Sequence, residues 1–253
     1  MRLCLRSNVL VAVVLGVFWA AGAQAQTADE VIGKHIAAIG GRAALEKLET
    51  RVSTGTISMS VQGTAISGPA EITAKAPNKS RSYFSLDLSQ FGAGEIVVDQ
   101  RCDGKTAWAS NSMQGERELT GSQLQAILNS TFPTPLLGYK ESGATAELVG
   151  KETVGTRPAI AVKLTPKAGN PTTFYFDAEN YLLLRTASRI EVPEAGGEVE
   201  QKSELEDYRE VDGVKLPFVV KISNGMQDIS VTLNKIEHNK PVDEAIFSKP
   251  AGK

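Results

Sequence analysis

The sequence predicts a mainly β (α+β) fold, a curved antiparallel half-barrel of about 11 strands closed by short helices. Most of the chain after residue 50 alternates apolar and polar side chains with a period of two, which is the period of a half-buried strand. Short turn sequences separate these runs, so consecutive strands are expected to pair antiparallel. Helical periodicity is confined to the region before residue 50 and to one segment near the middle.

Residues 1–25 have the three parts of a secretory signal peptide. A basic start precedes an apolar run at 9–21, which is too short to cross a membrane, and Ala23-Gln24-Ala25 is a small-x-small cleavage site. We therefore expect export to the periplasm and a mature chain that begins at Gln26. Residues 26–253 are predicted to form a single half-barrel domain.

Two helices are predicted at the start of the mature chain. Thr27 or Asp29 can cap the first helix, and Gly40-Gly41 ends it. The apolar stripes of the two helices consist of Val31, Ile32, His35, Ile36 and Ile39, and of Ala44, Leu45 and Leu48. These stripes are the apolar surfaces available to fill the concave side of a curved sheet.

The alternating runs place the strands, and Asp-Gly and Asn-Gly turns punctuate them. The runs are centred on residues 57–61, 66–73, 84–88, 96–102, 106–108, 148, 160–164, 174–176, 182–184, 205–211, 216–220 and 229–233. One face of almost every run is apolar, so the sheet must wrap around something. Cys102 shares the apolar face of Ile96 and Val98, which favours a small buried hydrophobe over a reactive thiol.

The segment after residue 119 interrupts the alternation. Leu124, Ile127 and Leu128 lie on one helical face, and residues 132–137 then form an irregular apolar loop with two prolines. Two interpretations of this loop stay open: a lid over a cavity, or a plug over the open end of the sheet. Trp108, just after a tight turn, is likewise either a core residue or a residue at a cavity rim.

Composition and motifs argue against most enzymatic functions. After processing the formal net charge changes from −2 to −4 with no basic block, which gives nucleic-acid binding little support. His35 and His238 lie in no metal-ligand spacing, and the chain lacks a G-x-S-x-G elbow and a phosphate loop. Only Cys102 remains, so an intramolecular disulfide is impossible. We expect no enzymatic activity, no metal and no cofactor.

The strand at 205–211 contains an unusual pair of charges. Alternation places Asp207 and Arg209 on the apolar face with Leu205, whereas Glu206 and Tyr208 fall on the solvent face. Unpaired charges in an apolar core cost several kcal/mol each, so the two residues must be paired or near water. Three interpretations stay open: an ion pair at the solvent-exposed strand end, an arginine at the mouth of an apolar cavity oriented by the aspartate, or a bulge that shifts the alternation.

Four segments carry a resemblance to a known family: AIGGRAALEKLET at 38–50, DGKTAW at 103–108, YFDAENYLLLR at 175–185 and LEDYREVDGVKLP at 205–217. They resemble recurring pieces of periplasmic LolA-like proteins, the outer-membrane lipoprotein-sorting family and its relatives. The resemblance covers roughly Asp29 to Pro250 and rests on turn and strand patterns, so it concerns the fold more than the chemistry. It implies an incomplete antiparallel barrel, closed by helices, with an apolar cavity between them.

The resemblance also implies carriage of a lipid or an acylated lipoprotein, with membrane-associated donor and acceptor proteins as further partners. An inward arginine that engages a helical lid belongs to the family's mechanism, and Arg209 is its candidate counterpart here. The rival hypothesis is a sensor or scaffold domain that uses the same fold for protein contacts. The candidate cavity and lid residues are Trp108, Leu124, Ile127, Leu128, Phe132, Leu136, Leu137, Phe174, Phe176, Leu184 and Phe218, with Asp207 and Arg209 at the polar mouth.

Overall fold

The computed structural model describes residues 26–61, 63–192 and 196–249. The predicted signal peptide lies outside these residues. The helices are α1 (Ala28–Ala38), α2 (Arg42–Leu45) and α3 (Gly121–Asn129), with short 3-10 turns η1 (Ser89–Phe91) and η3 (Glu244–Phe247). No helix among the described residues has the length and apolar character needed to cross a bilayer.

Local sequence signals set the ends of α1 as predicted. The Thr27 hydroxyl accepts a hydrogen bond from the Glu30 backbone N–H, and the Glu30 carboxylate accepts one from the Thr27 backbone N–H, which is a complete capping box. At the other end Gly40 has a φ of 127°, and a Cβ there would collide with the backbone carbonyl of Gly213. The glycine therefore ends the helix and lets the turn at Asp212-Gly213 approach it.

The strands form one sheet in which every neighbouring pair is antiparallel. They are β1 (Thr50–Val61), β2 (Thr64–Lys75), β3 (Lys79–Asp87), β4 (Glu95–Cys102), β5 (Ala107–Asn111), β6 (Gly115–Leu119), β7 (Thr145–Val154), β8 (Arg157–Thr165), β9 (Thr172–Asp177), β10 (Leu183–Val192), β11 (Gly197–Val211), β12 (Val214–Ser223) and β13 (Asp228–His238). The order across the sheet is β6-β5-β4-β3-β2-β1-β13-β12-β11-β10-β9-β8-β7.

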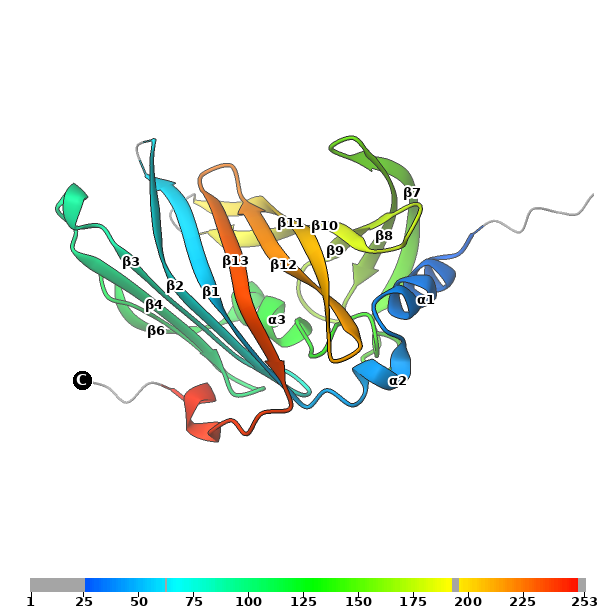
Figure 1. The fold of residues 1–253 in the computed structure, drawn as a ribbon, viewed down its shortest axis with the longest axis horizontal. Helices are drawn as coiled ribbons and strands as arrows, with labels where there is room; N and C mark the ends of the chain where they lie inside the picture. The colour runs from blue at the N-terminus through cyan, green and yellow to red at the C-terminus, as the bar shows by residue number, and fades with distance from the viewer. Residues whose placement is uncertain (1–25, 62, 193–195, 250–253) are drawn as a thin grey trace, which may run out of the picture.

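The predicted fold class is confirmed: the sheet curves strongly and is not closed into a barrel (Figure 1). It has thirteen strands where about 11 were predicted, and all but one of the thirteen correspond to a predicted run. The strand missing from the predicted runs is β6, whose first four residues are all exposed. A polar edge strand has no apolar face to reveal it by alternation, although its charges suit an unpaired sheet edge.

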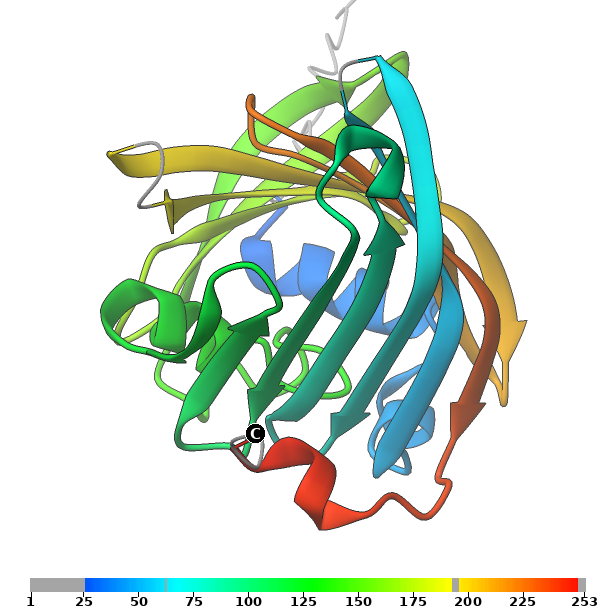
Figure 2. The same cartoon turned by 90° about the vertical axis from the view of Figure 1, so that its left-hand side faces the viewer.

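The main core lies between the concave face of the sheet and α1 with α2. Val31 and Leu45 of these helices pack with Phe176 and Val214 of the strands, and all four side chains are almost fully buried. Figure 2 shows α1 inside the arch of the sheet, while α3 lies toward its open side. The predicted helical stripes therefore fill only part of the concavity.

The two halves of the curved sheet are called its wings: one contains β4, β5 and β6, and the other contains β8 to β11. A second, smaller apolar cluster holds α3 against the first wing. Cys102, Ala107 and Leu119 of β4, β5 and β6 are buried, and the apolar face of α3 packs over them. The buried-hydrophobe interpretation of Cys102 is confirmed, and burial raises the pKa of its thiol. No residue of α3 is itself fully buried.

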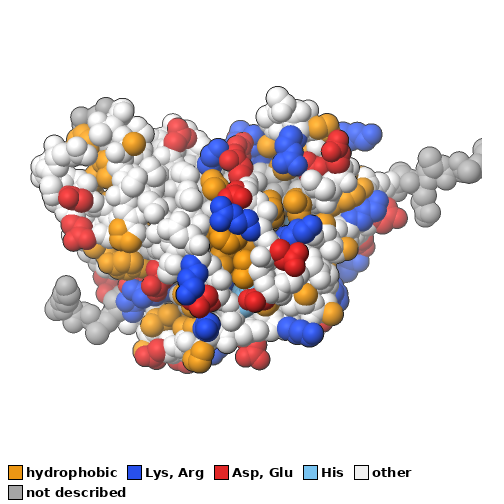
Figure 3. All heavy atoms as spheres, viewed as in Figure 1, with side chains coloured by type: hydrophobic (Ala, Val, Ile, Leu, Met, Phe, Trp, Pro, Cys, Tyr) orange, Lys and Arg blue, Asp and Glu red, His pale blue; other side chains and the backbone are white. Residues whose placement is uncertain are grey.

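The convex face is polar and carries ion pairs between neighbouring strands. Arg185 on β10 contacts Glu204 on β11, and Lys221 on β12 contacts Glu206 on β11. Figure 3 shows side chains of both charge signs interspersed over the front of β11 and β12. The Lys221–Glu206 pair is exposed and the Arg185–Glu204 pair is partly buried. Ion pairs at a solvated surface contribute little to stability.

Two buried histidines make the fold sensitive to mild acid. Burial lowers the pKa of His35, whose Nδ1–H donates to the Tyr181 carbonyl, and burial together with Arg51 lowers the pKa of His238. A folded pKa below the unfolded value of 6.5 means that neutral histidine stabilises the fold above that pH. This stabilisation is lost as the pH falls below 6.5.

We therefore predict that the urea midpoint falls between pH 7.5 and pH 5, a window that brackets the reference histidine pKa of about 6.5. The variant His35→Asn/His238→Asn, which keeps a donor near each Nδ1 position but has no titrating ring, should show a flatter profile. Urea titrations at several pH values measure this. Parallel profiles for the two proteins would contradict the assignment.

Candidate ligand-binding site

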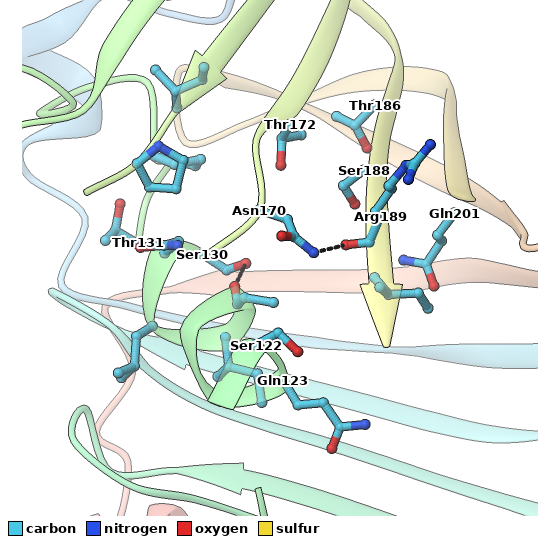
Figure 4. A pocket seen from close by; sticks show the side chains of 18 of the residues that line it. Ser122, Gln123, Ser130, Thr131, Asn170, Thr172, Thr186, Ser188, Arg189 and Gln201 are labelled. Carbon is cyan, nitrogen blue, oxygen red and sulfur yellow. Dashed lines mark hydrogen bonds between the residues drawn. The ribbon is translucent and has the colours of Figure 1, made fainter. Parts of the chain in front are cut away.

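A large cavity of about 710 Å³ lies between α3 and the concave face of the sheet. One wall is α3 with the loop that follows it, and the facing wall is the concave side of β8 to β11 (Figure 4). The third side comes from Gln100, Arg117 and Leu119 on β4 and β6. The volume is in the range of small-molecule sites.

Part of the cavity lining is apolar. Phe174 and Leu164 on the sheet are buried beneath it, while Ile127 and Leu128 on α3 are half-buried. The apolar lining residues are Leu119, Ala126, Ile127, Leu128, Pro135, Tyr139, Ala144, Leu164, Pro166, Phe174 and Ile190. This part offers a surface for an acyl chain.

The rest of the lining is polar and, apart from Arg117, Arg189 and Glu191, uncharged, which alternation had not indicated. Thr172, Ser188 and Gln201 lie side by side on β9, β10 and β11, and Thr186 and Ser203 form the next row. Figure 4 shows Thr172, Thr186, Ser188 and Gln201 on the sheet wall, across the cavity from α3, which carries Ser122 and Gln123. The cavity therefore has an apolar part and a hydroxyl-rich part.

Polar contacts join α3 to β6 on one side of the cavity and to β10 on the other. Gln123 accepts a hydrogen bond from Arg117 at 2.8 Å and donates one to the Glu191 carbonyl at 3.1 Å, and Ser122 donates to the Glu191 carboxylate. At the other end of the helix, Asn129 donates to the Ala168 carbonyl at 2.8 Å. These bonds hold α3 across the opening between the two wings.

A second groove of about 410 Å³ separates α1 from the loop at residues 136–141. Asp29 of α1 accepts a hydrogen bond from the Tyr139 hydroxyl and contacts the Lys140 ammonium group. Tyr139 lines both the groove and the large cavity, so this contact forms part of the partition between them.

The structure distributes the sequence-predicted apolar residues over several places. Ile127, Leu128 and Phe174 line the large cavity, and Leu124 packs in the cluster under α3. Residues buried in the main core are Phe132, Leu136, Phe176 and Phe218, with Leu137 partly buried beside them. Leu184 lies in a separate cluster with Val154 and Ala159, and Trp108 is half-buried on the face opposite to Cys102 and Ala107.

The loop at 132–137 packs into the core at two points. Phe132 is 8% exposed and Leu136 is 2% exposed, so their side chains are covered by the concave face and α1. Leu137 is the more accessible of the two leucines and lines the groove along α1. The buried side chains match the plug interpretation more closely than that of a free lid.

Asp207 and Arg209 pair with each other at the surface. The Arg209 Nε donates to Asp207 Oδ1 at 3.1 Å, and more than 40% of each side chain is exposed. The Arg209 guanidinium lies 4.5 Å above the ring of buried Phe218, away from the lining of the large cavity. Asp207 has a φ of 53°, so the backbone leaves regular strand geometry there.

Tyr208 is less exposed than its predicted place on the solvent face implies. Its hydroxyl donates to the Leu183 carbonyl at 2.8 Å, so the ring lies down on the sheet and burial raises the tyrosine pKa. Glu206, by contrast, forms the expected outward ion pair with Lys221. A long aromatic side chain can reach a backbone acceptor on the neighbouring strand, which alternation alone does not reveal.

Arg51 is an inward cation that the sequence analysis missed. Although part of the residue is accessible, protein surrounds its guanidinium, and this burial lowers the pKa to about 10. The guanidinium lies 5.3 Å from the ring of Phe132, and no ion pair joins it to any carboxylate of the described residues. Counting back from Ile57 and Met59 in steps of two would have placed Arg51 on the concave face.

His238 lies opposite Arg51 on the neighbouring strand. Its Nδ1 is 3.1 Å from the Asp212 carboxylate, while its buried Nε2 has no hydrogen-bond partner within the described part of the chain. Within the same residues, no three His, Cys, Asp or Glu side chains gather in a way that could hold a metal ion. The chemistry around the cavities is that of hydrogen bonding and apolar contact.

The geometry defines a half-barrel that encloses an amphipathic cavity. Solved structures of other proteins share the half-barrel fold. A LolA superfamily protein from Nitrosomonas europaea is 12% identical with a TM-score of 0.57, over 89% of this chain and 99% of that one. A DUF1329 family protein from Desulfovibrio piger is 12% identical with a TM-score of 0.55, over 87% and 97% of the two chains.

A putative outer membrane lipoprotein-sorting protein domain from Vibrio parahaemolyticus is 8% identical with a TM-score of 0.53, over 87% of this chain and 95% of that one. The sequence matched no protein-family model and no curated protein. The predicted LolA-like fold is thereby confirmed, and identities this low show the fold alone.

Phe218 is buried in the core, whereas the side chains of its charged neighbours Asp207 and Arg209 are exposed. We predict that Phe218→Ala lowers the free energy of unfolding by about 3–5 kcal/mol, because it leaves a cavity beneath β11 and β12. Arg209→Leu, which keeps apolar cover on the ring, should leave the urea midpoint unchanged within error. A large loss of stability in Arg209→Leu would show that the ion pair is structural.

The plug interpretation of the loop makes a separate prediction. Leu136→Ala should cost about 2–5 kcal/mol of unfolding free energy, because the side chain is enclosed. Leu137→Ala removes the same atoms at a half-buried site and should cost only about 0.5–1.5 kcal/mol. Equal and small losses for both variants, measured by urea titration, would favour a detached lid.

Proposed function

We propose that this protein is a non-enzymatic periplasmic binding or carrier protein for an apolar, acylated ligand, either a lipid or a lipoprotein. The observation that supports this most directly is the cavity of about 710 Å³ between α3 and the concave sheet face. A ligand there would contact Phe174 and Leu164 on the sheet and Ile127 on α3. The signal peptide pattern at residues 1–25 supports the periplasmic location.

The similarity to a lipoprotein-sorting domain supports carriage in general terms, since that protein shares the half-barrel. Delivery to or from a membrane would require donor and acceptor proteins. Helix α3, which covers the cavity, is suited to release of a ligand. None of its residues is fully buried, and hydrogen bonds to Glu191 join it to β10. Such contacts are individually weak in water.

Filling the cavity tests the proposal. Ala126 on α3 is exposed and lines the cavity, so Ala126→Trp should occupy the space with little effect on folding. We predict that the native protein binds an environment-sensitive apolar dye, that fatty acid displaces it, and that Ala126→Trp weakens dye binding at least about tenfold, which is about 1.4 kcal/mol. The urea midpoint should stay within about 0.5 kcal/mol of the native value.

Ala43→Trp on α2 is the matched control, because Ala43 is also an exposed helical alanine and lies outside both cavities. It should bind the dye like the native protein. Equal dye binding by both variants, or none by the native protein, would reject the cavity as the binding site. A protein that co-purifies in place of lipid, seen by native mass spectrometry, would favour the scaffold alternative.

A further inference from the structure

The polar half of the large cavity is built from aligned strands, so its side chains form a regular grid. Ser188 on β10 lies directly opposite Thr172 on β9 and Gln201 on β11, and Thr186 lies opposite Ser203. Directly opposite residues on one face are about 5 Å apart. Five hydroxyl and amide groups therefore face the same space over three adjacent strands.

These groups are free to bind a ligand. Among the hydrogen bonds of the described residues, none involves the side chains of the five grid residues, Thr172, Thr186, Ser188, Gln201 and Ser203. The neighbouring polar residues are in use: Ser122 and Gln123 hold α3, and Asn170 donates to the Arg189 carbonyl and to Glu198. The grid is thus an unengaged part of the polar lining.

The grid continues into the apolar part along the same strands. On β9, Thr172 is followed two residues later by Phe174 and four residues later by Phe176, both buried. On β11, Leu205 lies two residues after Ser203, on the same face, and packs against the core. A ligand lying along these strands would pass from apolar contacts near α1 to hydroxyl groups near the far end of the cavity.

Few charges line the cavity, and two of the three are already engaged. Arg117 donates to Gln123, and Glu191 accepts from Ser122, so both serve to hold α3. The third, Arg189, alternates with Ser188 along β10, so its exposed side chain belongs to the opposite face of the sheet from the grid. An anionic head group would find little compensating charge beside the grid, whereas hydroxyl groups, which donate and accept, match serine, threonine and glutamine side chains.

We infer that the ligand of this cavity is an acylated molecule whose head group is uncharged and rich in hydroxyl groups, such as a glycosyl or polyol lipid. The inference rests on the proposed function and narrows its ligand class. The five side chains of the grid bind the hydroxyl groups, and Phe174 and Leu164 contact the first part of the acyl chain.

The test compares amphiphiles that share one alkyl chain. Binding of dodecyl maltoside, dodecylphosphocholine and dodecanoate to the mature protein is measured by isothermal titration calorimetry, below micelle-forming concentrations. The maltoside should bind at least about tenfold more tightly than the other two, since several hydrogen bonds of about 0.5–1.5 kcal/mol each separate them. A choline head group offers no hydroxyl, and a carboxylate only accepts.

The variant Thr172→Val/Thr186→Val removes two grid hydroxyls with little change of shape. It should weaken maltoside binding about three- to thirtyfold and leave dodecanoate binding unchanged. The matched control is Thr173→Val/Thr232→Val, which removes two hydroxyls from the convex face. This control should bind all three amphiphiles like the native protein.

The outcomes separate this inference from the proposed function. Equal affinity for the three amphiphiles, or a double grid variant that behaves like its control, overturns the inference while the acyl-binding function stands. Tighter binding of dodecanoate or dodecylphosphocholine also overturns it. Binding of no dodecyl amphiphile, together with no dye binding, overturns the proposed function itself.

Discussion

The structure depends on one constraint: the concave face of a single antiparallel sheet is largely apolar and must be covered. No second sheet covers it in the described part of the chain. The concave face of thirteen strands must be kept from water, and the helices available are short. Helix α1, with α2, covers the wing near β8, β9 and β12, where Phe176 and Val214 are almost fully buried. The space between that wing and α3 remains open as the large cavity.

The division of the concave face follows from how each helix is attached. The capping box, the packed stripe of Val31 and Ile36, and the close approach of Gly40 to Gly213 fix α1 in the core. In α3 the apolar face is only half-buried, and its contacts with β10 are hydrogen bonds to Glu191. Helix α1 therefore belongs to the main core, while α3 covers the cavity.

Charged groups are placed so that the cavity remains nearly neutral. Asp207 and Arg209 neutralise each other at the surface, and the Arg51 guanidinium lies over Phe132 at a distance from the cavity lining. On the convex face, Asp99 accepts hydrogen bonds from Arg81 and Arg101, which lower its pKa although burial alone would raise it. Hydroxyl and amide groups are left as the main polar surface inside the half-barrel.

Local signals in the sequence, namely alternation, caps and turns, were enough to predict every strand except β6, the helices and the antiparallel, LolA-like class of fold. The same signals placed Cys102 and the α1 stripe in the core. The set of residues that line the cavity, by contrast, depends on how distant strands are arranged in space. Thr172, Ser188 and Gln201 are polar residues on three different strands, and the strand register places them side by side as one polar surface. Arg51 and His238 come from opposite ends of the chain and lie opposite each other on neighbouring strands. Neither contact leaves a signal within a local window of sequence, because each depends on which strands become neighbours.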